Sequence, residues 1–549
     1  MRLHPTKFRA KRALIGSLAS LAVCLVIGLG ITTTAGAGST PAPDKTRSRA
    51  QRALRQGEYE MAAQLFRDLL AIDENDQQAH LGLGISLLKQ RDLRTAFDHA
   101  TRAVSLNPRS SQAHALVGTV VLAAGDFHTA VEEFRVALRL EPNEAMAVAG
   151  LAMVDFYGNH FFDSFVGLQH AVALDPNEPD YVFNLAQAAS RIERFKESAD
   201  AYERFLRVAP RTDADRRERI RGLIRFLRYL SKVSDLYVME GATHAAVPFT
   251  ADDNRPIMEV HINGEKEPLR FLLDTGSGMS VISDTAARRV GVRAVARGGA
   301  ARGIGGNGRF DIVYGFLSSL DIGGARIRNV PVYIRPLFTS GRPVDGYIGL
   351  TVISKFLTTI DYGARLFIMD RQQRVPVDRR PEAQPQPSPS VGVEIPLRTT
   401  LGGYLSGEVQ LEGIDKPLNF IIDTGASVSV VSQLLAMREE MDRFAKSTRL
   451  RVYGAAGVAE DVKLLVLPRV TLGSFMRESV PAVVLDLDSI NETSGFDQTG
   501  IVGGNFLRHF RITFDFQRGV VRLEPIQTSA AIPEDKINSL AKPVSAVEP

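Results

Sequence analysis

A long segment in the second half of this chain occurs twice, and this duplication restricts how that half can fold. Asp-Thr-Gly follows an apolar run at Asp274 and again at Asp423, 149 residues later. Toward the end of the two copies, Asp361 matches Asp515 at a distance of 154 residues. Small loop insertions between two copies of one domain produce such a slowly growing distance. The second half is therefore predicted to hold two domains of the same fold.

Both copies are predicted to be all-β lobes, at residues 252–375 and 392–526. Short runs of alternating apolar and polar residues there are separated by glycine. A proline-rich spacer, 376–391, is predicted to join the lobes in an extended form, and the tail 527–549 is predicted to be disordered. In each lobe an apolar run ends at the aspartate, so a sheet would present that carboxylate at its edge. Two carboxylates in equivalent places are what a paired-carboxylate hydrolase requires.

The composition excludes several kinds of site. Cys24 is the only cysteine, so the rest of the chain can form no disulfide, cysteine nucleophile or thiolate metal site. The ten histidines show no His-Glu-x-x-His spacing, and neither a metal nor a cofactor is expected. The formal net charge is only +4 and the arginines are scattered, so nucleic acid is not an expected partner.

Residues 1–40 are predicted to direct the chain out of the cytoplasm. Five basic residues precede an uncharged stretch, 13–32, which is followed by Ala35-Gly36-Ala37. This order is typical of a cleavable signal peptide. The stretch is also long enough to span a bilayer, so an uncleaved segment would anchor the chain in the membrane with its N-terminus in the cytoplasm. Both alternatives place the rest of the chain in an extracytoplasmic location, either periplasmic or secreted.

Residues 45–232 carry a repeat of 34 residues. Three series keep this period: Pro108, Pro142, Pro176 and Pro210; Ala62, Ala96, Ala130, Ser164 and Ser198; Tyr59, Leu93, Phe127, Phe161 and Phe195. The pattern resembles the tetratricopeptide repeat (TPR), a stack of antiparallel helix pairs whose small residues let the helices approach closely. About five repeats and a capping helix are predicted. The resemblance implies an all-α solenoid that holds a protein partner on its concave face.

The residues around the two acids resemble those of retropepsin-type aspartic peptidases. The segments 271–277 (Phe-Leu-Leu-Asp-Thr-Gly-Ser) and 420–426 (Phe-Ile-Ile-Asp-Thr-Gly-Ala) match the catalytic loop of that family. Downstream, Gly349 and Gly503 each follow two apolar residues, as in its second signature. Two such lobes in one chain resemble the pepsin arrangement. The resemblance implies that Asp274 and Asp423 share one proton and activate a water molecule to hydrolyse an extended peptide or protein substrate.

The resemblance also assigns supporting roles around the catalytic pair. These positions are Thr275, Gly276, Ser277, Thr424, Gly425 and Ala426. The two threonines would form hydrogen bonds across the lobe interface, and the two glycines would let the backbone approach the carboxylates. A hydroxyl after the glycine can bond the neighbouring carboxylate, and only the first lobe has one. The two lobes are therefore expected to differ electrostatically, and the choice of the base stays open.

Glycine-rich segments follow the two acids at equal distances. Gly305 and Gly454 each lie 31 residues after the aspartate of their lobe. The family places its mobile flap at about this position, and glycine suits a lid that must bend. The predicted flap and substrate-contacting residues are Gly305, Gly306, Tyr453 and Gly454.

The leading hypothesis is an aspartic endopeptidase, membrane-tethered or secreted, whose repeats recruit a protein substrate or a regulator. In the alternative, the chain is a non-catalytic scaffold whose repeats and lobes only bind peptides or proteins. In a variant of the first hypothesis, lobes of two chains pair to give a homodimer. Pairing within one chain requires the two catalytic aspartates to face each other across a cleft between its own lobes.

Overall fold

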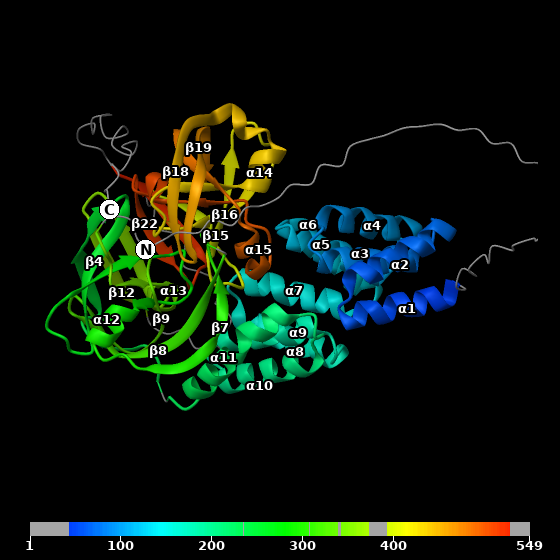
Figure 1. Cartoon of the computed structure of the whole chain (residues 1–549), viewed down its shortest axis with the longest axis horizontal. Helices are drawn as coiled ribbons and strands as arrows, with labels where there is room; N and C mark the ends of the chain where they lie inside the picture. The colour runs from blue at the N-terminus through cyan, green and yellow to red at the C-terminus, as the bar shows by residue number, and fades with distance from the viewer. Residues whose placement is uncertain (1–42, 234, 307, 339–341, 373–391, 527–549) are drawn as a thin grey trace, which may run out of the picture. The chain divides into compact units, whose positions relative to one another are not determined.

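The structure is a computed structural model that describes residues 43–526, except 234, 307, 339–341 and 373–391 (Figure 1). The predicted export segment (1–40), the spacer (376–391) and the tail (527–549) lie outside the described residues. Within the described ranges, no helix combines the length and the apolar character that a bilayer-spanning segment needs.

The first half of the described chain consists of consecutive α-helices. They are α1 (Pro43–Gln56), α2 (Tyr59–Ile72), α3 (Gln77–Lys89), α4 (Leu93–Leu106), α5 (Ser111–Ala123), α6 (Phe127–Leu140), α7 (Ala145–Tyr157), α8 (Phe161–Leu174), α9 (Pro179–Arg191), α10 (Phe195–Val208) and α11 (Ala214–Leu230). The helices α1 to α10 form five pairs, and α11 follows as the capping helix. The helical array that the 34-residue period predicts is thus confirmed.

The helix ends follow from local chemistry. Asp76, Asp92, Ser110 and Asp126 each accept a hydrogen bond from the backbone N–H three residues later, which satisfies a donor that the first helical turn leaves open. Each periodic proline follows the second helix of its pair, as Pro108 follows α4. Proline cannot continue a helix, because it lacks the N–H and its ring clashes with the preceding turn.

Small residues at the helix contacts set the spacing of the array. The periodic small residues are all fully buried: Ala62, Ala96, Ala130, Ser164 and Ser198. Two glycines leave room for the ring of Phe134, because a β-carbon on either Gly118 or Gly150 would overlap it. Small residues thus allow the helices to approach closely, and an aromatic ring fills the space that two of the glycines leave.

The first β lobe is built on a nine-stranded sheet. Its strands are β1 (Val238–Gly241), β3 (Thr250–Asp252), β4 (Arg255–Ile262), β5 (Leu269–Leu273), β6 (Val281–Ser283), β7 (Ala294–Arg302), β8 (Arg309–Ile322), β9 (Ala325–Arg335) and β10 (Gly346–Ile348). The order is β1-β9-β6-β10-β5-β4-β8-β7, with β3 paired to β4. Two helices, α12 (Asp284–Arg289) and α13 (Leu350–Ile353), follow β6 and β10. The β region begins at Val238, before residue 252, because β1 pairs with β9.

The second lobe repeats this plan with an eight-stranded sheet. Its strands are β14 (Arg398–Thr399), β15 (Leu405–Leu411), β16 (Leu418–Ile422), β17 (Ser429–Ser432), β18 (Ala445–Gly454), β19 (Gly457–Leu472), β20 (Phe475–Leu485) and β21 (Gly500–Val502). The order is β14-β15-β16-β21-β17-β20-β19-β18. The helices α14 (Gln433–Arg438), α15 (Asp488–Ser494) and α16 (Gly504–Leu507) lie between strands in sequence. In both lobes the strand before the aspartate pairs in parallel with the strand before the second-signature glycine.

A third sheet joins the two lobes within one chain. It contains β2 (His244–Pro248), β11 (Phe356–Asp361) and β12 (Leu366–Arg371) from the first lobe, and β13 (Val393–Pro396), β22 (Phe510–Asp515) and β23 (Val520–Pro525) from the second. At its centre β11 pairs with β22, and the hydroxyls of Thr359 and Thr513 are 2.9 Å apart. Asp361 and Asp515 accept backbone N–H groups in the hairpin turns that follow these strands. The lobes thus pair intramolecularly.

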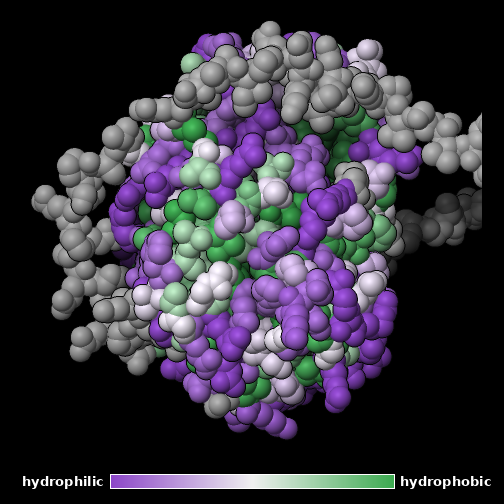
Figure 2. All heavy atoms as spheres, turned by 90° about the vertical axis from the view of Figure 1, so that its left-hand side faces the viewer, coloured by the Kyte–Doolittle hydropathy of each residue, from purple (hydrophilic) through white to green (hydrophobic). Residues whose placement is uncertain are grey.

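The helical array contacts both lobes. The ring of Phe226 on α11 stacks on Tyr314 of the first lobe, with 4.5 Å between the ring centroids. From the second lobe, Phe496 is fully buried and packs edge-on against Phe127 and Tyr157 of the array. On the face drawn in Figure 2, hydrophilic residues dominate and the apolar residues form small groups between them. Large aromatic side chains therefore pack at the places where the array meets each lobe.

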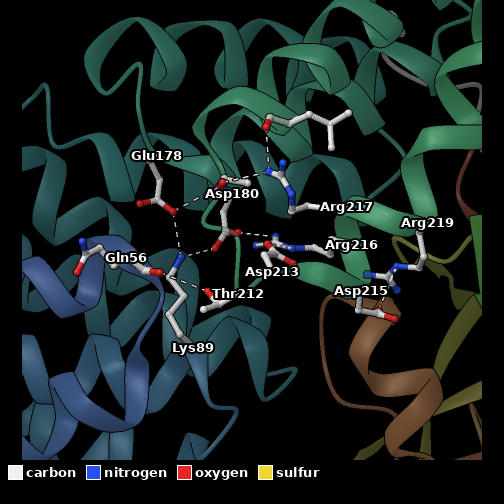
Figure 3. Close-up of polar contacts among 12 residues, drawn as sticks. Gln56, Lys89, Glu178, Asp180, Thr212, Asp213, Asp215, Arg216, Arg217 and Arg219 are labelled. Atoms are coloured by element: carbon white, nitrogen blue, oxygen red, sulfur yellow. Dashed lines mark hydrogen bonds and ion pairs between the residues drawn. The ribbon is translucent and has the colours of Figure 1, made fainter.

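The two ends of the helical array are bridged by ion pairs (Figure 3). Lys89 Nζ on α3 lies 2.9 Å from Glu178 Oε1 and 2.5 Å from Asp180 Oδ2, both at the start of α9. Arg216 Nη1 on α11 lies 2.6 Å from the other oxygen of Asp180. The burial of Asp180 acts to raise its pKa, but the charges of Lys89 and Arg216 outweigh burial and lower that pKa. Thr212 also donates a hydrogen bond to the carbonyl of Gln56, next to the first repeat.

The Lys89→Met substitution should loosen this bridge. It removes the cation between Glu178 and Asp180, and because these groups keep some exposure we expect a loss of about 1–2 kcal/mol of unfolding free energy. The matched control is Lys196→Met, which removes an exposed pair with Asp200 on one helix and should change stability by less than about 0.5 kcal/mol. Thermal unfolding of the two variants tests the difference. Equal melting temperatures would show that the bridge does not hold the array together.

Candidate functional site

The two predicted catalytic aspartates lie where parallel strands of their lobes end. Asp274 follows β5, and its backbone N–H donates to the carbonyl of Ile348 at the end of β10 (3.0 Å). Asp423 follows β16, and its N–H donates in the same way to Val502 at the end of β21 (3.0 Å). Parallel strands bring their carboxyl ends to one edge of a sheet, so each lobe presents its aspartate there.

Reciprocal hydrogen bonds between two buried threonines hold the catalytic loops against each other. Thr275 Oγ1 donates to the carbonyl of Ile422 (2.7 Å) and accepts from the backbone N–H of Thr424 (3.0 Å). Thr424 Oγ1 donates to the carbonyl of Leu273 (2.7 Å) and accepts from the N–H of Thr275 (3.2 Å). Both threonines are fully buried. Each hydroxyl therefore satisfies a donor and an acceptor of the opposite lobe.

The two carboxyl groups lie close together, and the glycines beside them make this approach possible. Each carboxyl influences the pKa of the other. A β-carbon on Gly425 would lie 2.6 Å from Asp274 Oδ1, and one on Gly276 would overlap the carboxyl of Asp423. Any larger residue at either position would therefore push the carboxyls apart.

Backbone N–H groups distinguish the two aspartates. Asp274 Oδ1 accepts one from Gly276 (2.9 Å), whereas Asp423 Oδ1 accepts one from Gly425 (2.7 Å) and another from Ala426 (3.2 Å). The hydroxyl after the first glycine does not bond the carboxylate as expected. Ser277 Oγ donates instead to the carbonyl of Met279 at 2.7 Å. The electrostatic difference between the lobes thus comes from backbone donors and not from the serine.

The contact between the carboxyls perturbs their titration. Burial and then the neighbouring charge of Asp423 raise the pKa of Asp274 well above its ordinary value. Burial also raises the pKa of Asp423, although hydrogen bonds from Gly425, Asp274 and Ala426 oppose that rise. Two carboxylates in contact cannot both ionise without a large electrostatic cost, so the pair tends to retain one proton.

The second-signature glycines lie directly under the catalytic loops. A β-carbon on Gly349 would lie 2.7 Å from the carbonyl oxygens of Ser277 and Met279, and one on Gly503 would lie 2.7 Å from the carbonyl of Val428. The N–H of Gly349 also donates to the hydroxyl of Ser280 (3.0 Å). At both glycines the backbone packs directly against the backbone that follows the catalytic loop. Only glycine fits there, and this packing supports the catalytic loops.

The predicted flaps form two long hairpins whose tips meet. One hairpin is β7–β8 and the other is β18–β19, and both are labelled in Figure 1. The N–H of Ala456 donates to the carbonyl of Ile304 (2.8 Å), and the N–H of Gly306 donates to Val458 (3.2 Å). Gly305 and Gly454 are in close contact with the opposing tip. Of the predicted flap residues, Tyr453 and Gly454 line the cavity described next.

A cavity of about 4500 Å³ contains the aspartates and continues along the inner side of the helical array. Arg335, at the end of β9, lines it and was not predicted from the sequence. Its Nη1 donates to the carbonyl of Ala455 in the opposite flap tip (2.6 Å), and its guanidinium lies 4.5 Å from the ring centroid of Phe310. The duplication gave no signal for this residue, because the matching position in the second lobe is Leu485. Within the described ranges, no three His, Cys, Asp or Glu side chains converge as a metal site requires.

The Thr424→Val substitution should weaken the contact between the catalytic loops. Valine matches threonine in shape but leaves the carbonyl of Leu273 and the N–H of Thr275 buried without partners, which should cost about 2 kcal/mol or more. Thr424→Ser keeps the hydroxyl and loses one methyl group, so its cost should be only about 1 kcal/mol. Thermal unfolding measures both changes. A valine variant as stable as the serine variant would contradict this role for the hydrogen bonds.

Family models match both halves of the chain. A model described as aspartyl protease matches residues 258–352 and 407–506, so that each match contains one Asp-Thr-Gly loop. A tetratricopeptide repeat model matches residues 47–114 and 81–145. A search of curated proteins returns no match.

Solved structures also match part of the chain. TTC0263, a thermophilic TPR protein of Thermus thermophilus, is 21% identical and covers 32% of this chain and 95% of its own, with a TM-score of 0.28. MamA from Desulfovibrio magneticus RS-1 is 23% identical over 31% of this chain and 96% of its own (TM-score 0.23). YrrB, described as a TPR protein with an unusual peptide-binding site, is 15% identical over 31% and 87% (TM-score 0.21). By its sequence matches and its architecture, the chain joins an N-terminal array of tetratricopeptide repeats to a duplicated region of the aspartyl protease family.

Proposed function

We propose that this chain is an aspartic endopeptidase that hydrolyses peptide bonds with Asp274 and Asp423. The observation that carries the proposal is the close approach of these two carboxyls, each at the end of a buried strand. An intact pair is required only for chemistry, since a surface that merely binds peptides has no need to bury two acids against each other. The threonine hydrogen bonds supply the rigidity that such a pair needs.

The backbone donors favour Asp423 as the ionised member of the pair. It accepts more N–H groups than Asp274, and these donors stabilise a negative charge. In the proposed reaction Asp423 takes a proton from a water molecule, while the protonated Asp274 donates its proton to the scissile carbonyl oxygen. The water oxygen bonds to the carbonyl carbon to give a diol. Asp423 then donates its proton to the amide nitrogen while Asp274 takes a proton from a diol hydroxyl, so that the C–N bond breaks, the amine leaves and a carboxylic acid forms. No covalent enzyme intermediate forms.

The cavity fits a polypeptide better than a small molecule. Its volume of about 4500 Å³ far exceeds the range of about 300–1,000 Å³ that is typical of small-molecule sites. The flap tips meet, and residues of both tips line the cavity that holds the aspartates, so the tips have to separate before a chain can lie between the lobes. The helical array continues the same cavity, which supports a role in presenting a protein substrate or a regulator to the cleft.

Loss of either acid should abolish cleavage. The full chain would be incubated with a diverse peptide library from pH 3 to 8, beside Asp274→Asn and Asp423→Asn. Each variant removes one half of the acid–base pair, so we expect losses of roughly 10²- to 10⁴-fold in kcat/KM. Asp361→Asn is the matched control, because asparagine can keep the turn hydrogen bond that Asp361 accepts. Activity that survives both active-site changes would refute the proposal, and peptide binding without cleavage by the parent would support the scaffold alternative.

The raised pKa values also predict how stability depends on pH. A carboxyl whose pKa is raised by folding stabilises the protein fully below its unfolded pKa and loses that contribution as the pH rises through the folded value. The Asp274→Asn variant lacks this pH-dependent loss. The melting temperature of the variant minus that of the parent should therefore be larger at pH 8 than at pH 4. Asp180→Asn should behave oppositely, because the pKa of Asp180 is lowered and its stabilisation is present at high pH. A parallel response of the two variants would contradict the assignment.

A further inference from the structure

The last residue of α9, Arg191, brings a positive charge from the helical array into the cavity that holds the catalytic pair. Arg191 and both aspartates line this one cavity. The guanidinium lies near the rings of Phe156 and Phe161, at 5.8 and 5.9 Å from their centroids. These distances are close to the outer limit for a cation–π interaction, and aromatic rings satisfy none of the five N–H donors of the guanidinium by hydrogen bonding.

Among the described residues, the side chain of Arg191 makes neither a hydrogen bond nor an ion pair. Its charge interacts with the hydroxyls of Tyr202, Tyr333 and Tyr237, which stay neutral because burial raises their pKa values. Burial lowers the pKa of Arg191 in turn, since no acid of the described chain compensates its charge. A partly buried cation without a counter-ion is costly, so its partner is expected to come from outside the chain.

Two other arginines of the array that line the same cavity, Arg216 and Arg219, have acids of their own. Figure 3 shows Arg216 beside Asp180 and Asp213, and Arg219 beside Asp215. The exposed Arg194, three residues after Arg191, pairs with Glu197 at 3.5 Å. Arg191 thus differs from its neighbours in lacking an acid among the described residues, although it sits deeper in the molecule than Arg194.

Contacts on both sides of Arg191 hold it in place against the second lobe and the first. Gln187 Nε2, one turn earlier, donates to the carbonyl of Leu401 at 3.4 Å, and Tyr202 fixes that amide through a 2.6 Å hydrogen bond. Two residues after Arg191, Glu193 binds Lys355 of the first lobe at 2.7 Å. The arginine is therefore docked between the lobes and does not swing freely on a mobile helix end.

The turn at Gly403 links Arg191 to the catalytic loop. A β-carbon on Gly403 would lie 3.1 Å from Arg191 Nη2, so the guanidinium packs directly against this turn. Gly278, four residues after Asp274, lies against the same turn, since its β-carbon would be 3.3 Å from the Cα of Gly403. Arg191 and Gly278 therefore contact the same turn, and both line the cavity that holds the aspartates.

We propose that Arg191 binds a carboxylate of the peptide substrate, on a residue a few positions from the scissile bond, so that the helical array contributes directly to substrate choice. This inference rests on the proposed peptidase function. A guanidinium pairs with a carboxylate through two parallel N–H···O bonds, which suits both an acidic side chain and a C-terminal carboxylate. Arg191 acts here as a specificity residue and takes no part in the chemistry at the aspartates.

The test compares peptides that differ only in charge. A decapeptide cleaved by the full chain would be made with Glu or Gln at each position in turn, and with a free or an amidated C-terminus. At the position that contacts Arg191, Arg191→Gln should lower kcat/KM about ten- to a hundredfold for the acidic peptide, mainly through KM, and leave the Gln peptide unchanged. Arg191→Lys should retain part of the preference. If the preference instead depends on whether the C-terminus is free or amidated, the bound group is the C-terminal carboxylate.

Arg194→Gln is the matched control. Arg194 lies three residues after Arg191, is exposed, and already pairs with an acid, Glu197. This substitution should leave both peptides unaffected, and melting curves would show that all variants fold. The inference is overturned if parent and Arg191→Gln discriminate equally between acidic and neutral peptides.

A binding measurement separates this inference from the proposed function. Fluorescein-labelled decapeptide pools, with Glu or Gln at one position each, would be titrated into the full chain carrying Asp423→Asn, with and without Arg191→Gln. Tighter binding of a Glu pool that disappears with Arg191→Gln supports the inference even if the parent cleaves nothing, in which case only the peptidase proposal fails. Equal binding of all pools overturns the inference whether or not cleavage occurs.

Discussion

The reciprocal threonine hydrogen bonds between the catalytic loops are the interaction on which the rest of the site depends. Thr275 and Thr424 each satisfy a carbonyl and an N–H of the other lobe, and both are fully buried. They hold the two loops so that the carboxyls lie close together. This arrangement is electrostatically unfavourable once both acids ionise. The central pairing of β11 with β22 supplies the larger framework, and it confines the whole arrangement to one chain.

The helical array and the lobes act together through one continuous cavity. The array is bridged by Lys89, Asp180 and Arg216 and packs against both lobes, so its inner side opens toward the catalytic loops and not only toward solvent. Repeat arrays commonly present a concave surface to a partner. Here Arg191 of the array also lies on the wall of the cavity. The same part of the array would then both recruit and select a substrate.

Periodicity and duplication made much of the architecture predictable. The 34-residue period predicts helix pairs because the same small residues recur at every helix contact, and the structure buries all of them. The shift between the two copies predicts paired lobes, and the matching glycines point to matching close approaches of backbone. Ser277 did not follow the prediction from its position after the first catalytic glycine. Its hydroxyl donates to the carbonyl of Met279 and not to a carboxylate. A local residue pattern does not reveal which of two possible acceptors is closer.

The sequence by itself determined the elements that depend on local or repeated chemistry: the helix caps, the repeat positions, the apolar strands and the two acids at their ends. Only the tertiary structure decided which distant groups meet. Arg335 and Arg191 have no repeated counterpart and no motif, and their positions result from docking between parts of the chain far apart in sequence. Such contacts depend on the shape and charge of both surfaces together. A periodic pattern within one segment does not predict them.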